Sequence, residues 1–347
     1  MAGDAGRCAV SSGRREYTEE DVRIRPGKGS RPRTRNRPAH ADAVPGVVVA
    51  VDRGRYTCLL GEPGRTSDDA VEVVAKKARE LGRTGVVVGD RVGLVGDTSG
   101  EVDAIARLIR VEPRRSVLRR TADDDDPVER VIVANAEQLA VVTAVANPEP
   151  RPRLIDRCLV AAFDAGLEPL LIVTKVDLQP PDVLLELYQP LGVAMVVATR
   201  GGDLAAVRTA LAGRVTVLVG HSGVGKSTLV NALVPTALRT TGVVNAVTGR
   251  GRHTSTSAVA LRLPFGGWVV DTPGLRSFGL AHVTPGDVLR GFGDLATAAQ
   301  DCPRGCTHLA DSPDCALDDA ITAGVVEPAR LDSFRRLLGS RLAPSDA

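Results

Sequence analysis

The sequence predicts an α/β protein in which a small β-barrel is followed by a helix-covered parallel sheet and then by a helical C-terminal segment. Short β-like runs separated by turn residues fill residues 44–111. Strand-like and helix-like runs then alternate between 131 and 272, which is typical of a largely parallel sheet with both faces covered. The β pattern disappears after residue 286, where three of the six cysteines cluster.

The first 43 residues carry more Lys and Arg than Asp and Glu, although the whole chain of 347 residues has a net charge of only +2. This segment lacks apolar periodicity and cannot bury enough surface to fold alone. We therefore expect a disordered basic arm over 1–43. Two roles remain open for it: a solvated tail, or an arm that contacts the phosphates of nucleic acid.

The distribution of apolar residues and cysteines bears on the cellular compartment. The polar N-terminus shows no secretory signal, and no apolar run approaches the ~18 residues of a membrane span. Cys8, Cys58 and Cys158 are scattered rather than spaced as a disulfide framework. Scattered thiols in a chain without a signal indicate a reducing compartment. We expect a cytoplasmic protein with no membrane partner.

A series of β-like runs predicts the barrel, among them "GVVVAVD", "YTCLL" and "DRVGLV". Short strands bounded by turn residues favour a small closed barrel, for which the OB-fold is the common case. An SH3-like barrel remains an alternative, because periodicity does not separate the two. The basic segment "EPRRSVLRRT" (112–121) and the acidic run Asp123–Asp126 that follow are both predicted to be solvated.

The segment "GHSGVGKST" (220–228) follows the β-like run "RVTVLVG" and opens the helix-like run "STLVNAL". It matches the phosphate-binding pattern G-x-x-x-x-G-K-[ST], and it lies between a strand and a helix as this pattern requires. Backbone amides and the helix N-terminus bind phosphate, Lys226 reaches the β- and γ-phosphates, and Ser227 holds Mg²⁺. The predicted nucleotide contacts here are Gly220, His221, Ser222, Gly223, Val224, Gly225, Lys226, Ser227 and Thr228.

The segment "WVVDTPG" (268–274) places Asp271 and Gly274 at the end of a further strand. Both residues fit a D-x-x-G element, in which the Asp supports Mg²⁺ through water and the glycine amide senses the γ-phosphate. An enzyme that uses ATP would need this Asp equally. The element therefore predicts a nucleoside triphosphate without identifying its base.

The segment "LLIVTKVDL" (170–178) reads as a buried strand that ends in a polar loop. Thr174, Lys175, Val176 and Asp177 match the [N/T]-K-x-D pattern with which GTPases recognise guanine. The Asp carboxylate accepts hydrogen bonds from guanine N1–H and the exocyclic amine, which adenine does not offer, and the Lys stem lies against the base. Such a loop belongs at the carboxyl end of a parallel strand. After the next strand, the amide of Ala198 is predicted to bind guanine O6.

Cys302, Cys306, His308 and Cys315 form the pattern C-x₃-C-x-H-x₆-C. Three thiolates and one imidazole can close a tetrahedral zinc site that leaves no open position for catalysis. The alternative is a set of reduced surface cysteines beside a chance histidine. We expect one structural Zn²⁺ that nucleates a small helical domain, which would otherwise have too little core.

The nucleotide elements come in an unusual order, since the guanine loop precedes the phosphate loop and the D-x-x-G element comes last. In an ordinary GTPase the phosphate loop comes first. A parallel sheet tolerates this exchange of halves if the old termini lie close together. The predicted fold class is α/β: a circularly permuted P-loop GTPase domain (119–285), an N-terminal OB-fold β-barrel (44–118) and a C-terminal helical zinc-binding domain (286–347).

This order, together with "ANAEQ" (134–138), "GHSGVGKSTLVN", "GRGRHTSTS" and "DTPGLRSFG", resembles the RsgA (YjeQ) family of ribosome-small-subunit-dependent GTPases. The resemblance covers nearly everything except the basic arm. It implies GTP hydrolysis in late maturation of the small ribosomal subunit, with GTP or GDP, Mg²⁺ and one structural Zn²⁺ as cofactors. It also implies the small subunit and its rRNA as partners, and we expect a monomer without a DNA partner.

The chain departs from the family pattern at three places. Thr174 stands where Asn is commoner, and Val197 stands where the family often has Ser. The zinc pattern of the family has one residue more in its first gap and one fewer in its last. The first two departures bear on how tightly guanine is held.

The catalytic group is expected in the switch loop 236–257. Leu275, directly after D-x-x-G, cannot position water as the Gln of many GTPases does. The family resemblance points to His253 for this task, the alternative being a surface histidine in a mobile loop. Thr254 is predicted to close on Mg²⁺ and the γ-phosphate. Docking on the ribosome would order the loop, so intrinsic turnover is expected to be slow.

Two rival functions stay open on the sequence alone. One is an ATP-dependent P-loop enzyme such as a kinase, which competition between nucleotides would separate from a GTPase. The other is an RNA-binding module with a vestigial nucleotide site. The intact Lys226, Ser227 and Asp271 argue against the second rival.

Overall fold

A computed structural model of the chain describes residues 42–61, 70–120, 130–235, 258–272, 278, 280 and 283–342. All of them lie in one compact unit, residues 40–347. The basic arm predicted over 1–43 falls outside the described residues except for its last two positions. Among the helices that the structure describes, none is long and apolar enough to cross a membrane.

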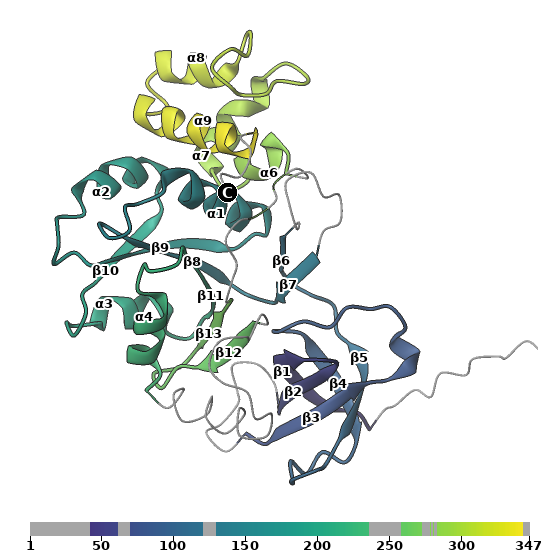
Figure 1. Ribbon diagram of the computed structural model, residues 1–347. Coiled ribbons are helices and arrows are strands. Elements are labelled where there is room, and N and C mark those ends of the chain that lie inside the picture. The colour runs from purple at the N-terminus through teal and green to yellow at the C-terminus, as the bar shows by residue number, and fades with distance from the viewer. Residues whose placement is uncertain are drawn as a thin grey trace, which may run out of the picture. The chain divides into compact units, whose positions relative to one another are not determined.

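A central sheet carries the predicted parallel strands (Figure 1). Strands β10, β9, β8, β11 and β13 lie side by side in this order and are parallel, and β12 pairs antiparallel with β13. Every residue of β8 is buried, as expected for a strand covered on both faces. The bounds are β8 Gln138–Ala144, β9 Glu168–Thr174, β10 Ala194–Ala198, β11 Val215–Val219, β12 Val259–Arg262 and β13 Trp268–Asp271.

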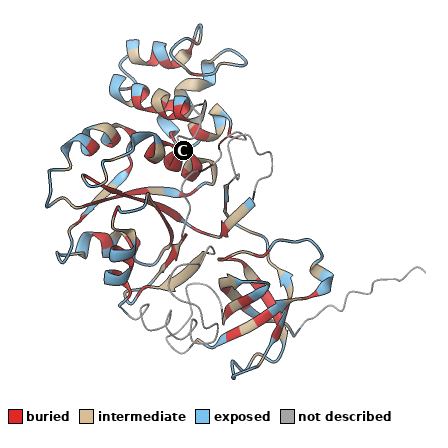
Figure 2. Ribbon diagram, in the orientation of Figure 1, coloured by how far each residue is buried: buried red, intermediate tan, exposed pale blue. Residues whose placement is uncertain are grey.

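Helices cover both faces of the central sheet, whose strands are largely buried (Figure 2). Leu139 and Val141 of β8 belong to one core with α1 and α2, whereas Ala140 and Val142 belong to a second core with α3 and α4. This alternation follows from the period of two that a strand imposes on its side chains. The bounds are α1 Pro152–Asp164, α2 Asp182–Tyr188, η3 Gln189–Leu191, α3 Ala205–Leu211 and α4 Lys226–Leu233.

The N-terminal strands close into a barrel. They pair in the order β1-β2-β3-β5-β4, and β4 returns to pair with β1. The β3–β5 pair is parallel and the other pairs are antiparallel. This closure and crossover fit the five-stranded Greek-key barrel of the OB-fold, so the OB-fold prediction is confirmed. The bounds are β1 Val44–Asp52, β2 Arg55–Leu60, β3 Glu72–Lys77, η2 Arg79–Leu81, β4 Arg91–Gly96 and β5 Ala106–Val111.

The segment after the barrel differs from the solvated linker that its charge predicted. Val117–Arg120 form β6, which pairs antiparallel with β7, Arg130–Ala134. Leu118 is buried, and Arg114 forms a two-pronged ion pair with the buried Asp90, with N–O distances of 2.7 and 2.9 Å. The prediction was wrong because the partner strand lies beyond the acidic run, where local charge gives no sign of it.

The C-terminal helices do not build a core of their own. Phe292 lies between Phe163 of α1 and Phe334 of α9, with ring centroids 4.7 and 5.3 Å apart. These rings belong to the same buried cluster as β8. The segment thus compensates for its small size by sharing the core of the central sheet. The bounds are α6 Pro285–Leu289, α7 Gly293–Ala298, η4 Ala299–Asp301, α8 Ala316–Thr322 and α9 Pro328–Leu342.

Charged side chains of α1 also contact the C-terminal helix. Arg336 Nε lies 3.1 Å from Asp156 Oδ2, and burial raises the pKa of Asp156 against the opposing effect of the Arg336 charge. The neighbouring Arg157 donates to the backbone carbonyls of Phe278 and Ser340. Helix α1 therefore connects α9 to Phe278, which follows Gly274 of the D-x-x-G element by four positions.

Candidate functional site

The phosphate loop joins the carboxyl end of β11 to the N-terminus of α4. A Cβ on Gly220 would lie 2.4 Å from the carbonyl oxygen of Val142 on β8, so only glycine fits there. Gly225 has a φ of 93°, which side chains rarely adopt, and Lys226 begins the helix directly after it. The loop therefore sits at the carboxyl edge of the sheet, where its amides and the helix N-terminus can bind an anion.

Lys226 connects this loop to the strand that carries the D-x-x-G element. Its Nζ donates to Asp271 Oδ1 at 2.7 Å and to the carbonyl of Thr272 at 3.3 Å. Thr272 in turn donates its hydroxyl to the carbonyl of Leu218 on β11 at 2.9 Å. The fold thus places the ammonium and the carboxylate that suit a triphosphate and its Mg²⁺ beside one another, although 45 residues separate them.

The predicted guanine loop touches the phosphate loop. Thr174 Oγ1 lies 2.6 Å from the carbonyl of Val224 and 3.1 Å from the carbonyl of Thr143. Lys175 has a φ of 60° and donates its Nζ to the carbonyl of Asn147. Two loops that lie 50 residues apart in the sequence therefore form one surface.

A cavity of about 520 Å³ opens between these loops. Its size is within the range of small-ligand sites. Ala198, the predicted partner of guanine O6, is buried and lies in its wall. The lining residues are Thr174, Lys175, Ala198, Thr199, Arg200, Gly201, Gly202, Asp203, Leu204, Arg208, Gly223, Gly225, Thr228, Leu229 and Ala232.

The other predicted residues have varied surroundings. Val176 packs partly buried against the core, and Asp177 is exposed at the end of the guanine loop. Ser222 and Ser227 are exposed, and His221 Nδ1 lies 2.8 Å from the carbonyl of Ser222. The predictions for His253, Thr254, Gly274 and Leu275 fall outside the described residues.

Sequence reasoning missed several side chains that the fold adds to this site. Arg200 and Arg208 line the cavity, and Thr272 links Lys226 to β11. Arg200 follows Ala198 by two positions and Thr272 follows Asp271 directly. Their closeness in sequence to predicted site residues could have identified them. Arg208 lies on a helix and gave no such signal.

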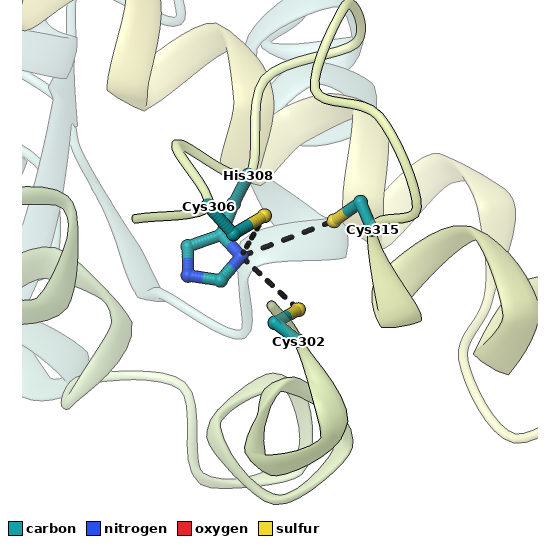
Figure 3. Close-up of side chains that lie close together, drawn as sticks. All are labelled: Cys302, Cys306, His308 and Cys315. Atoms are coloured by element: carbon teal, nitrogen blue, oxygen red, sulfur yellow. Dashed lines mark hydrogen bonds between the residues drawn. The ribbon is translucent and has the colours of Figure 1, made fainter. Parts of the chain in front are cut away.

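The four predicted metal ligands come together in the segment between η4 and α8 (Figure 3). The Nδ1 atom of His308 lies 3.6 Å from the sulfur of Cys302, 3.4 Å from that of Cys306 and 3.9 Å from that of Cys315. A tetrahedral Zn²⁺ with ordinary Zn–S and Zn–N bonds sets sulfur and nitrogen about 3.6 Å apart. The donor set and its spacing therefore fit one zinc ion.

The surroundings of His308 keep its ring suited to a metal. Burial, and after it the positive charge of Arg335, lowers the pKa of His308, which favours the neutral imidazole that a metal requires. Arg335 also donates its Nε to the carbonyl of His308 at 3.1 Å and forms a two-pronged pair with Asp318. The cluster is thereby fixed to α8 and α9.

The chain order of the strands, compared with their order in the sheet, defines the class of protein. Starting from β11 and its phosphate loop, the order β11, β12, β13, β8, β9, β10 would place the phosphate loop first, then D-x-x-G, then the guanine loop. This is the order of an ordinary GTPase, and here the chain enters it at β8. The fold and the site are those of a circularly permuted P-loop GTPase, with an OB-fold barrel before it and a Cys₃His cluster after it.

Comparisons with known proteins give the family. The model of the RsgA GTPase family matches residues 111–281. The small ribosomal subunit biogenesis GTPase RsgA of Pseudomonas aeruginosa (strain LESB58) is 40% identical over 264 residues, which are 74% of this chain and 76% of that protein. The protein of the same name from Chlorobaculum parvum is 34% identical over 309 residues, 86% of this chain and 98% of that one. The chain belongs to the RsgA GTPase family.

Solved structures agree with this assignment. The crystal structure of YjeQ from Thermotoga maritima is similar with a TM-score of 0.64 and 26% identity, covering 86% of this chain and 99% of that one. The structure of YloQ, described as a circularly permuted GTPase, has a TM-score of 0.62 at 22% identity, covering 88% of this chain and 97% of that one. The second likeness supports the fold.

Proposed function

We propose that this GTPase acts in the late maturation of the small ribosomal subunit and that the subunit stimulates its turnover. The names of the relatives support the ribosomal role. The observation that carries the guanine-nucleotide site is the 2.6 Å contact between Thr174 Oγ1 and the Val224 carbonyl. It holds the predicted guanine loop against the phosphate loop, which neither an ATP-dependent enzyme nor a vestigial site requires.

In the proposed complex, base and phosphates are held by different loops. Asp177 accepts hydrogen bonds from guanine N1–H and the amine, the stem of Lys175 covers one face of the base, and the Ala198 amide binds O6. The segment 220–228 wraps the phosphates, with Lys226 between the β- and γ-phosphates. To reach them, Lys226 exchanges its hydrogen bond with Asp271 for bonds to phosphate oxygens.

The proposed roles around the γ-phosphate combine described and undescribed residues. Ser227 and Thr254 would hold Mg²⁺, Asp271 would support it through water, and the Gly274 amide would sense the γ-phosphate. His253 would orient the attacking water, because Leu275 offers no polar group for this task. Ordering of this loop by the ribosome would account for the stimulation.

The proposed organisation assigns a separate task to each part of the chain. The barrel (44–118) and the helical zinc domain (286–347) would grip the subunit, and the GTPase domain (119–285) would time release. One structural Zn²⁺ on the Cys₃His cluster would fix the loop between η4 and α8. We propose a cytoplasmic monomer whose basic arm (1–43) adds contacts to nucleic acid.

The barrel offers a basic face for rRNA. Arg55 on β2 and Lys76 on β3 are directly opposite in the register, and both are exposed. Like charges directly opposite on paired strands destabilise a sheet, so an anionic partner would relieve their repulsion. In OB-folds the face around strands 2 and 3 binds oligonucleotides. We propose that this pair contacts rRNA phosphates.

Arg55→Gln and Lys76→Gln are expected to weaken binding to purified small subunits. Each lost phosphate contact should make the negative slope of log affinity against log salt shallower by about 0.7–0.9, because fewer counterions are released. Affinity measured at several salt concentrations checks this. Arg110→Gln, an exposed charge on β5 of the same barrel, is the matched control, and an equal loss in that variant would contradict the assigned face.

Asp177→Asn is expected to weaken GTP binding and to improve binding of xanthosine triphosphate. A carboxylate that accepts hydrogen bonds from N1–H and the amine contributes about 1.5–3 kcal/mol, whereas an amide at this position can donate to the xanthine carbonyl. Competition between the two nucleotides is the measurement. Asp182→Asn, the same change at an exposed residue of α2, should leave GTP affinity unaltered. Unchanged GTP affinity in Asp177→Asn would disprove the guanine site.

A further inference from the structure

Guanine has more hydrogen-bonding groups than the guanine loop can serve. Asp177 is proposed for N1–H and the amine, and the Ala198 amide for O6. The acceptor N7, next to O6 on the other edge of the base, is left without a partner. A buried acceptor without a donor costs binding free energy, so a site that binds guanine tightly needs a donor for N7 in the wall of the cavity.

Thr174 does not supply this donor. Its hydroxyl has a single hydrogen, and two backbone carbonyls lie within hydrogen-bond distance of Oγ1, that of Val224 at 2.6 Å and that of Thr143 at 3.1 Å. Thr174 is also buried. Its hydrogen is therefore used inside the protein, where it joins the two loops. The neighbouring Lys175 donates to the Asn147 carbonyl.

Two arginines in the same cavity wall have guanidinium donors without a partner among the described residues. Arg200 and Arg208 both line the cavity, and both are exposed. Neither guanidinium makes a hydrogen bond or an ion pair with the residues that the structure describes, unlike Arg114, Arg330, Arg335 and Arg336, which are paired. Two unpaired cations at one cavity indicate an electron-rich ligand group.

Arg200 is held in a defined turn. The Gly202 amide donates to the Thr199 carbonyl at 3.0 Å, and Gly201 has a φ of 72°, so Arg200 occupies the second position of a tight turn. Asp203 accepts a hydrogen bond from the Ala205 amide at 2.8 Å, which fixes the start of α3. The turn follows the proposed O6 partner Ala198 directly.

We propose that Arg200 and Arg208 form a second guanine-recognition element, which donates hydrogen bonds to the O6 and N7 edge of the base. The parallel donors of a guanidinium match these two acceptors. Adenine carries an amine in place of O6 and would face the same cation with a donor. The base is then recognised on both edges, by a carboxylate on one and by arginine on the other. This inference rests on the proposed guanine site and deepens it.

Two other groups in the cavity compete for this role. Thr199 and Thr228 also line it, and each has one hydroxyl donor. A hydroxyl offers one neutral hydrogen bond, whereas a guanidinium offers two charge-assisted ones in a fixed fork. Arginine could also bind the phosphates, but the phosphates would lie along 220–228, and neither arginine belongs to that loop.

The test compares GDP with 7-deaza-GDP, which lacks only the N7 acceptor. The wild-type protein is expected to bind GDP about tenfold more tightly, the lower range for an arginine pair on a guanine edge. The double variant Arg200→Gln/Arg208→Gln should reduce this ratio to about twofold or less while it still binds both nucleotides. Single variants show which arginine carries the larger share. Arg83→Gln, an exposed charge of the barrel, is the control and should keep the full ratio.

Several outcomes would overturn the proposal. If the wild type binds both nucleotides equally, or if the double variant keeps the tenfold ratio, the arginines do not bind N7. If Thr199→Val or Thr228→Val instead abolishes the difference in affinity between GDP and 7-deaza-GDP, a threonine hydroxyl binds N7. If the double variant loses affinity for GDP and for 7-deaza-GDP by the same factor, the arginines bind the phosphates and not the base. A wild type that binds no GDP at all would refute the guanine site itself, which separates that failure from the failure of this inference.

Discussion

Lys226→Ala is expected to lose measurable GTP binding, whereas His253→Ala is expected to keep GTP affinity and lose most of the rate that the small subunit stimulates. Lys226 begins α4 directly after the phosphate loop, and its Nζ lies 2.7 Å from Asp271 Oδ1. Hydrogen bonds from a charged donor contribute about 1.5–3 kcal/mol each, so losing contacts to two phosphates should weaken binding at least about 100-fold.

For His253 the argument concerns the reaction and not the binding. Hydrolysis needs a water molecule in line with the γ-phosphate, and a positioned acid–base group contributes about 10²–10⁴ in rate. Turnover of both variants, with and without purified small subunits, and nucleotide affinity are the measurements. His253→Gln, which can still orient a water, should retain more rate than His253→Ala. If small subunits stimulate His253→Ala as strongly as the wild type, His253 does not position the attacking water. If they do not stimulate the wild type, the ribosome does not activate this GTPase.

Cys315→Ser is expected to lose the bound zinc and to loosen residues 302–315 together with α8. Cys315 is buried and precedes the first residue of α8, so its thiolate would connect a bound zinc to that helix. A structural zinc contributes folding free energy directly, about 10–16 kcal/mol in isolated zinc-finger peptides. Here the effect should be local, because α9 stays attached to α1 through the Arg336–Asp156 pair and through Phe292, which lies between Phe334 and Phe163.

Elemental analysis and amide hydrogen exchange check this prediction. Zinc content should fall from one ion per chain to none, and amides of 302–322 should exchange faster, whereas those of α1 and α9 stay protected. A chelator should reproduce the pattern in the wild type. Thr307→Ala, an exposed non-ligand in the same loop, is the control and should keep its zinc. Wild-type protein without zinc, purified in the absence of chelator, would refute the metal site.

For the barrel, the sequence patterns predicted the strands but not how the strands pair. Runs of alternating residues predicted short strands over 44–111, but they did not distinguish an OB-fold from an SH3-like barrel. Pairing decided it, through the parallel β3–β5 pair and the β1–β4 closure. Pairing depends on which strands meet in space, and periodicity describes each strand by itself.

The prediction that the segment from Arg114 to Arg120 is solvated was wrong for a related reason. Its charge predicted solvation, but Arg114 pairs with Asp90, which is fully buried, and Leu118 packs into the core. A basic side chain looks solvated in the sequence whenever its partner lies far along the chain. Only the fold reveals that partner.

The sequence by itself predicted the phosphate loop, the exchanged order of the GTPase elements and the four candidate metal ligands that the fold brings together. The phosphate loop and the cysteine and histidine cluster each depend on residues a few positions apart, so that local backbone geometry imposes a spacing that can be recognised without the fold, and the exchanged order follows from where such short motifs stand along the chain. The tertiary structure decided which loops touch. The contacts Lys226–Asp271 and Thr174–Val224 join residues 45 and 50 positions apart, and Arg157 reaches Phe278 and Ser340 across 121 and 183 positions. It also brought Arg200 and Arg208 to one cavity. Contacts of this kind arise from the packing of helices on a common sheet, and no local pattern encodes them.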